Sequence, residues 1–158
     1  MSRHRAEIVW SSDGEFTAGT YSRAHDWRFD GGQTVRASSS PAVVRAPMSD
    51  PFGVDPEEAL VASASSCHML WFLDLARRAD LDVASYRDSA EGEMGKDPLG
   101  RTMITRIILR PHITFAGRQP GEAELVDLHH RAHDACFIAN SLKTDILVEP
   151  VAPVFAAD

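Results

Sequence analysis

The chain of 158 residues contains two cysteines, Cys67 and Cys136, whose thiols are its best candidates for covalent chemistry. A thiolate attacks a peroxide oxygen and becomes a sulfenic acid, and a second thiol condenses with that acid to form a disulfide. A cysteine in a buried helix is, however, more often an inert small hydrophobe. Two cysteines are too few for a four-cysteine zinc site. Inert core thiols, a redox pair and a mixed metal site therefore remain as alternatives.

Polar residues surround Cys67, which lies in Ser65-Ser66-Cys67-His68 within an apolar stretch. This stretch follows Asp55-Pro56-Glu57-Glu58, a clear helix start: an aspartate N-cap, a proline in the first turn and a capping-box glutamate. The pattern predicts a helix to about Ala79, buried on most sides. Glu58 accounts for the cap, so Glu57 is free for another role, roughly on the side of Cys67.

Cys136 comes near the end of a second predicted helix, which runs from Glu122 to about Ala139. The negative end of a helix dipole disfavours a thiolate, so Cys136 is a poorer attacking group than Cys67 and a better resolving thiol. His129 and His133 share a helical face with Cys136 and supply at most three metal ligands, without the glutamate of a zincin motif. We therefore expect a polar or titrating face there, and neither a metal nor a cofactor.

The remaining pattern predicts how these helices are positioned. Strands are expected at residues 5–10, 16–21 and 34–38, then a proline-rich loop at 39–54. Two long strands, 83–93 and 103–115, are expected to form a hairpin through the turn at 96–100, and a last strand spans 145–151. Because strands and helices do not alternate strictly, the pattern indicates one α+β domain over residues 1–158.

Composition excludes several classes of function. The net charge of −7, without a dense basic cluster, argues against nucleic-acid binding. The longest apolar run, Ala59 to Leu75, is interrupted by serines, His68 and Asp74, so we expect a buried helix and not a membrane span. Because no stretch resembles a signal peptide, we expect a cytoplasmic protein, where a purely structural disulfide is rare.

Two blocks of the sequence resemble the OsmC/Ohr family of osmotically induced and organic-hydroperoxide-resistance proteins. The first is Asp-Pro-Glu-Glu at 55–58 followed by Ala62–His68, similar to the family's Asn-Pro-Glu, small-residue helix and first cysteine. The second is His130–Ser141, which is similar to the family's second-cysteine segment. The resemblance extends from the first strand to Val148. Asp55 stands where the family often has asparagine, which matters little for a cap.

The resemblance implies a fold and an activity. The fold is an α+β, OsmC-like intertwined homodimer, in which two long central helices pack between antiparallel sheets. The activity is thiol-dependent reduction of organic hydroperoxides, in defence against oxidative stress. Cys67 would be the peroxidatic thiol and Cys136 the resolving thiol. A dithiol, such as a lipoylated protein, would be the reductant.

The resemblance also implies an arginine from the early strands that activates the first thiol and pairs with Glu57. Arg23 lies at the family's distance, and Arg28 and Arg45 are competitors. A guanidinium stays charged and stabilises a thiolate, and a carboxylate orients it by a bidentate pair.

The apolar residues after Cys67, Met69 to Phe72, are candidates for a pocket that favours bulky hydroperoxides, or else for core or dimer interface. The alternative function is a non-enzymatic stress protein of the same fold. Such a protein would bind a small hydrophobic ligand at the dimer interface, beside Trp71.

Overall fold

The computed structural model describes residues 2–152, 154 and 155. These residues form two compact units that divide between Ala59 and Leu60, and each unit is described by itself. The long helix α1 begins in the first unit and continues through the second. The mixture of sheets and two α-helices confirms the predicted α+β class.

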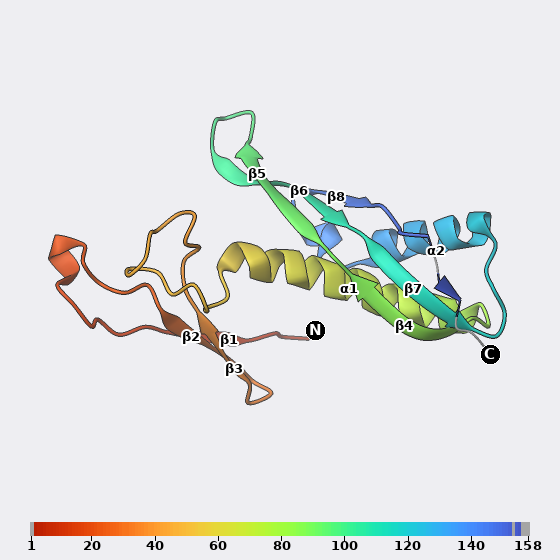
Figure 1. The fold of residues 1–158 in the computed structure, drawn as a ribbon, viewed down its shortest axis with the longest axis horizontal. Coiled ribbons are helices and arrows are strands. Elements are labelled where there is room, and N and C mark those ends of the chain that lie inside the picture. The colour runs from red at the N-terminus through yellow and green to blue at the C-terminus, as the bar shows by residue number, and fades with distance from the viewer. Residues whose placement is uncertain (1, 153, 156–158) are drawn as a thin grey trace. The chain divides into compact units, whose positions relative to one another are not determined.

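The elements follow one another along the chain as labelled in Figure 1. The helices are α1 (Pro56–Arg78) and α2 (Glu122–Ala135), with 3-10 turns η1 (Phe16–Ala18) and η2 (Ala139–Ser141). The strands are β1 (Ala6–Val9), β2 (His25–Phe29), β3 (Thr34–Ala37), β4 (Asp82–Asp88), β5 (Glu91–Lys96), β6 (Thr102–Leu109), β7 (Pro111–Ala116), β8 (Asp145–Val148) and β9 (Val154–Phe155).

The first unit carries an antiparallel sheet in the order β1-β2-β3. The strands predicted at 5–10 and 34–38 are confirmed as β1 and β3, and β2 was not predicted. The strand predicted at 16–21 is wrong. The chain there makes η1, which ends at Gly19 with a φ of 76°. A left-handed residue suits glycine and interrupts an extended strand.

The start of α1 is the predicted capping box. Asp55 Oδ1 accepts a hydrogen bond of 2.7 Å from the Glu58 N–H, and Glu58 Oε2 accepts one of 3.2 Å from the Asp55 N–H. The helix ends at Arg78, as expected. The expectation that α1 is buried on most sides is wrong, since its buried residues form a single stripe. By length and composition α1 could cross a membrane, but core side chains of this stripe pack within the second unit.

The second unit has two three-stranded sheets, β4-β7-β9 and β5-β6-β8. The turn predicted at 96–100 does join two antiparallel strands, β5 and β6. Each of the two predicted long strands is nevertheless broken, so that its halves join different sheets. The Asp88 carboxylate lies at this break, where it accepts hydrogen bonds from the Arg110 N–H and the Ser65 hydroxyl. The last predicted strand is confirmed in β8, which pairs in parallel with β6.

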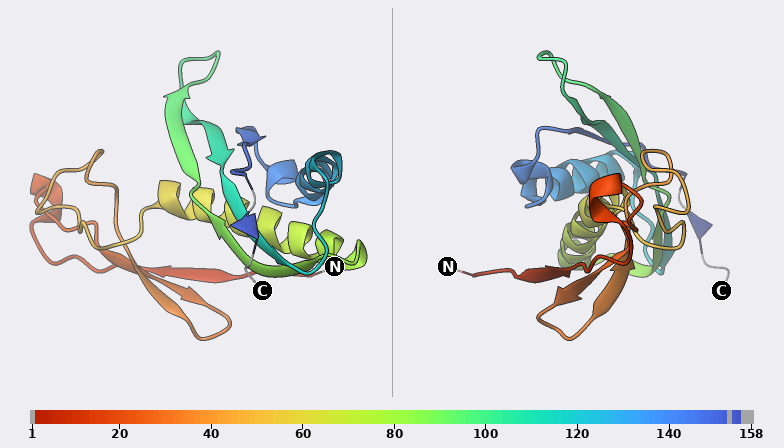
Figure 2. Two further views of the ribbon diagram at one scale, coloured as in Figure 1. Left: turned by 45° about the vertical axis from the view of Figure 1, so that its right-hand side comes forward. Right: turned by 90° about the vertical axis from the view of Figure 1, so that its left-hand side faces the viewer.

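Two apolar clusters form the core of the second unit. One combines α1, α2 and β7 through residues that include Phe72, Leu128 and Phe115. The other combines α1 with β6 and β8 through residues that include Ala64 and Ile107. In the right-hand view of Figure 2, α1 and α2 lie together on one side of the strands of this unit. The core therefore fixes α2 beside the helix that carries Cys67.

Candidate functional site

The second unit brings the two cysteines together. Cys67 lies within α1, and Cys136 is the C-cap residue of α2, with an extended backbone (φ −67°, ψ 110°). The predicted helix end at about Ala139 is therefore four residues too late, and Cys136 stands outside the last turn. Both cysteines are free, and their side chains interact. Cys67 is half-buried, whereas Cys136 is only 2% exposed.

Burial sets the protonation of Cys136. Loss of solvent and, second, the hydrogen bond with Cys67 raise the pKa of the Cys136 thiol to about 11. The backbone N–H of Ala139 lies 3.4 Å from the sulfur and opposes this rise. At neutral pH Cys136 is accordingly a protonated thiol, and a weak nucleophile until it loses its proton.

Cys67 opens onto a surface groove of about 330 Å³. The other lining residues are Leu70, Trp71, Asp74 and Phe137. The Trp71 and Phe137 rings meet edge to face, with centroids 5.5 Å apart. Phe137 could not be assigned to this groove from the sequence, because only the fold places the segment after α2 beside α1.

The walls of this groove match the predicted apolar stretch only in part. Leu70 and Trp71 line it, but Phe72 is fully buried in the core cluster with α2. The one acidic group in the lining is Asp74, which forms ion pairs with Arg77 at 3.1 Å and with Arg78 at 2.6 Å. The hydrogen bond from Arg77 is the largest cause that lowers the pKa of the Asp74 carboxyl. The groove is therefore apolar, with one compensated carboxylate.

A pair of histidines lies on the buried side of α1, next in sequence to the thiol. His68 Nε2 and His129 Nδ1 are 3.1 Å apart, so one ring donates a hydrogen bond to the other. The rings are nearly parallel, at 5°. His68 is 1% exposed and His129 3% exposed. Burial, then the charge of His133, lowers the pKa of His68 to about 4. Burial, then the charges of His68 and His130, lowers the pKa of His129 to about 3. Both imidazoles are neutral at neutral pH.

On the predicted helical face of His129, His133 and Cys136, the first and last residues are buried and His133 is half-buried. His129 points its Nδ1 at His68, which sequence analysis did not pair with it. Within residues 2–152, 154 and 155, no three histidine, cysteine or acidic side chains lie close enough together to hold a metal ion.

Arg23 belongs to the first unit. Its Nη1 donates hydrogen bonds to the carbonyls of Tyr21 at 2.7 Å and Gly19 at 3.3 Å, and its guanidinium carbon lies 3.9 Å from the centre of the Tyr21 ring. It lines a cavity of about 540 Å³, together with the mutually packed rings of Trp10, Phe16 and Tyr21. In the described part of the chain, no carboxylate forms an ion pair with Arg23.

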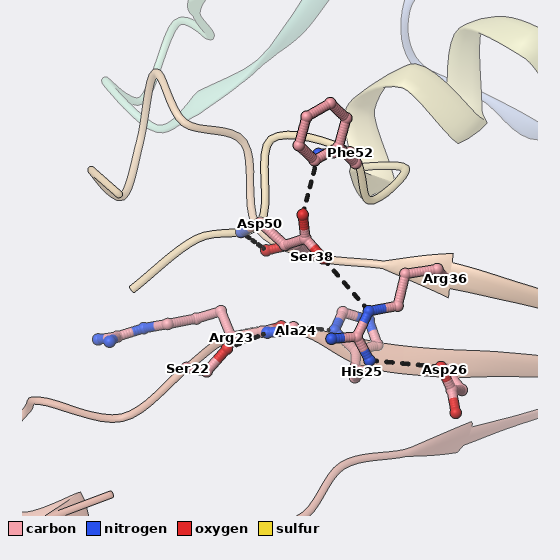
Figure 3. Close-up of polar contacts among 9 residues, drawn as sticks. All are labelled: Ser22, Arg23, Ala24, His25, Asp26, Arg36, Ser38, Asp50 and Phe52. Carbon is pink, nitrogen blue, oxygen red and sulfur yellow. Dashed lines mark hydrogen bonds and ion pairs between the residues drawn. The ribbon is translucent and has the colours of Figure 1, made fainter. Parts of the chain in front are cut away.

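The competing arginines differ from Arg23. Arg28 pairs with Glu7 at 3.5 Å, on the exposed surface, and Arg45 lines neither of the two cavities described here. Figure 3 shows Arg36 between Asp26 and Asp50, with ion pairs of 3.7 and 3.3 Å, whereas the Arg23 side chain extends away from them.

Glu57 stands in the first turn of α1 and is half-buried. The ion pair expected between Glu57 and Arg23, which both belong to the first unit, is not among the contacts of the described residues.

The fold and the site define an α+β protein with two free thiols in contact beside a surface groove. Comparison with known proteins gives the family. The family model for OsmC-like proteins matches residues 48–150, and the chain belongs to this family. No curated protein matches it.

Several solved structures resemble the chain in fold. An OsmC-like protein of unknown function from Vibrio cholerae is 47% identical, with a TM-score of 0.94 over 96% of this chain and 100% of its own. An organic hydroperoxide resistance protein from Elizabethkingia anophelis is 16% identical, with a TM-score of 0.65 over 99% of this chain and 98% of its own. The hydroperoxide resistance protein OhrB of Bacillus subtilis is 15% identical, with a TM-score of 0.59 over 93% of this chain and 98% of its own. The predicted OsmC-like fold is thus confirmed.

Proposed function

We propose that this protein is a thiol-dependent peroxidase that reduces organic hydroperoxides. The observation that carries the proposal is the contact between two free cysteines, one facing a groove and one buried. Inert core thiols require no such contact. Relatives named for organic hydroperoxide resistance share the fold and add support.

The reaction has two steps. The Cys67 thiolate attacks the outer peroxide oxygen, the O–O bond breaks, and the alkoxide leaves as an alcohol after taking a proton. Cys136 then attacks the resulting Cys67 sulfenic acid. An S–S bond forms, the S–O bond breaks, and water leaves with the proton of Cys136. A dithiol reductant, such as a lipoylated protein of the cytoplasm, restores both thiols by exchange.

Arg23 and Glu57 are our candidates for activating Cys67. A guanidinium stays charged at any working pH, and a thiolate is stabilised by such a charge beside it. The described contacts of Arg23 are backbone carbonyls and an aromatic ring, which position the group without neutralising it. Glu57 would orient this guanidinium.

We also propose a homodimer that forms through α1. An apolar segment of this helix has a mean hydropathy of 1.3, but only 28% of it is buried within one chain. Leu70 on this helix is 60% exposed. A second copy of the chain would cover such a surface, as apolar residues are costly to leave in water. Sedimentation of the purified protein at twice the mass of the chain would support this assembly, and a monomer at micromolar concentration would contradict it.

Cumene hydroperoxide consumption, with dihydrolipoate as reductant, tests the proposed activity. We expect sustained turnover by the wild-type protein, and its loss by at least roughly a thousandfold in Cys67→Ser, because the serine hydroxyl is not a comparable nucleophile. Full activity of Cys67→Ser, or none in the wild-type protein, would overturn the proposal.

The second candidate is a binding protein that holds a small hydrophobic ligand, favoured by the apolar groove beside Trp71. Mass spectrometry after mild peroxide treatment separates the two functions. A binding protein needs no disulfide, so quantitative linkage of Cys67 to Cys136 supports the peroxidase, and unmodified thiols support the binding protein.

A further inference from the structure

The buried stripe of α1 contains one polar side chain, His68, among residues that are otherwise apolar. Its neighbours one turn away are Ala64, which packs in the core cluster with β6, and Phe72, which packs in the cluster with α2. His129 stands in α2 between the buried Leu128 and Ala132. Each helix therefore offers one imidazole at a position where an apolar side chain would pack.

These two imidazoles make a directional contact. A hydrogen bond of 3.1 Å between His68 Nε2 and His129 Nδ1 joins α1 directly to α2. The Phe72 ring stacks on His129 with centroids 4.6 Å apart, which holds the imidazole plane. Apolar packing alone tolerates small slides and rotations of one helix on another, whereas a hydrogen bond weakens steeply with distance and angle.

The histidine pair is placed beside the two cysteines on both helices. His68 follows Cys67 directly, and His129 precedes Cys136 by two turns of α2. A shift of α2 along α1 that broke the imidazole bond would also move the C-cap that carries Cys136. Buried polar pairs are known to set the register of packed helices, at a cost in stability.

We propose that His68 and His129 are positioning residues that hold α1 and α2 in the register at which Cys136 reaches Cys67. This inference rests on the redox role proposed for the two cysteines. It concerns the closing step alone: Cys136 sulfur bonds to Cys67 sulfur, the leaving group on Cys67 departs with the electron pair of the broken bond, and the proton of Cys136 goes to solvent. Attack of Cys67 on the peroxide does not need this register.

A mixed disulfide measures the closing step without any peroxide. The half-buried Cys67 reacts with Ellman's reagent to carry a thionitrobenzoate group, and Cys136 then displaces the coloured thiolate. The release rate reports how well the two sulfurs are juxtaposed. Dimedone labelling of the sulfenic acid, after one equivalent of cumene hydroperoxide, measures the first step on the same variants.

Two double variants distinguish the effect of losing the helix register from the effect of disturbing the core packing. His68→Leu with His129→Leu fills the site with apolar atoms, and we expect release to slow by at least about tenfold while sulfenic acid forms at nearly the wild-type rate. His68→Gln with His129→Asn places amide groups where the two bonded ring nitrogens were, and we expect release within about threefold of wild type. Phe115→Leu, in the same core but outside the imidazole bond, is the control for general destabilisation.

Each outcome of these measurements either supports the positioning role or overturns it. Release at the wild-type rate in the leucine double variant overturns the inference, as does an equal slowing in Phe115→Leu of matched stability. If the leucine variant does not fold, failure of the folded Gln/Asn variant to restore release overturns it instead. If the wild-type protein ignores peroxide but the release rates follow the expected order, the positioning role stands and the proposed activity fails.

Discussion

Two pairs of side chains connect α1 to α2, and they differ in how they face solvent and in what they can do. The thiol pair, Cys67 and Cys136, has one member at a groove and one buried, and in the reaction proposed above its bond forms and breaks with redox state. The imidazole pair, His68 and His129, is buried at both members and stays neutral at neutral pH. Of these two successive residues of α1, Cys67 is the candidate for covalent chemistry, whereas His68 is the candidate for holding the helices in position.

Physical chemistry explains this division. Leaving an imidazole in the core costs free energy unless its hydrogen bonds are made, and the lowered pKa values of His68 and His129 show how strongly the site disfavours a charge. Because an apolar pair of similar volume is often as stable, or more so, the imidazoles contribute direction more than stability.

Replacement of Cys136 should give the largest effect, and it tests whether the two thiols have different roles, one attacking and one resolving. In Cys136→Ser we expect each chain to reduce one equivalent of hydroperoxide at close to the wild-type rate, and sustained turnover with a dithiol to fall by at least roughly a hundredfold. The reason is that Cys67 still attacks, but no thiol resolves its sulfenic acid. Stopped-flow peroxide consumption, followed by dimedone labelling, measures both quantities. Unchanged sustained turnover would show that Cys136 is not the resolving thiol.

The pH dependence of disulfide formation between Cys136 and Cys67 tests the protonation of Cys136. With its pKa raised to about 11 by burial, the thiolate fraction of Cys136 increases about tenfold for each pH unit below that value. Release of thionitrobenzoate from the Cys67 mixed disulfide should therefore rise by about a hundredfold from pH 7 to pH 9. A plateau near pH 8 would contradict the raised pKa. The Cys136→Ser variant, which cannot close, supplies the blank.

Low pH should lower the free energy of unfolding of the protein through the imidazole pair. The folded-state pKa values of His68 and His129, about 4 and about 3, lie below the usual 6.5, so the unfolded chain binds more protons as the pH falls. Stability is fully present above pH 6.5 and decreases below it. By pH 5.5 the two groups together cost about 3 kcal/mol of the free energy of unfolding.

Urea unfolding between pH 7.5 and 5.5 measures this loss. In the variant with leucine at both His68 and His129, the free energy of unfolding should change with pH by about 3 kcal/mol less than in the wild-type protein. An equal pH dependence in both proteins would mean that other groups cause the acid sensitivity. His133→Asn keeps the pair and removes the second cause of the lowered pKa of His68, so it should retain most of the loss.

Local signals were enough to predict the helix that carries Cys67. The capping box of Asp55 and Glu58 closes within four residues, so the start of α1 is readable from sequence. Strand β2 was not predicted, because charged side chains, Asp26 and Arg28, alternate with His25 and Trp27 along it. Gly19 explains the wrong strand at 16–21, because its left-handed φ is set by the turn that it makes.

The imidazole pair could not be predicted, because its members are 61 residues apart and meet only through the packing of α1 on α2. The sequence showed His129 on a face with His133, and gave no reason to connect it to His68. The breaks in the two predicted long strands, near Asp88 and Arg110, could likewise not be predicted from the sequence. A carboxylate that binds a distant backbone N–H has no periodic signature. The pairing of Cys67 with Cys136 was expected from the family resemblance, and the structure places the two side chains in contact.

The groove beside Cys67 gives the smallest expected effect, since Phe137 is 69% exposed and lies outside both helix-linking pairs. Phe137→Ala removes the edge contact with Trp71, and such aromatic contacts contribute about 0.5–1.5 kcal/mol. We expect the KM for cumene hydroperoxide to rise by roughly threefold to tenfold, with kcat and the thionitrobenzoate release rate nearly unchanged. The KM for hydrogen peroxide, which has no organic group to fill the groove, should stay constant. Phe52→Ala is the matched control, because Phe52 is 93% exposed and lines neither cavity. An equal effect of both substitutions, or an equal change for both peroxides, would show that Phe137 does not contact the substrate and that the groove selects nothing.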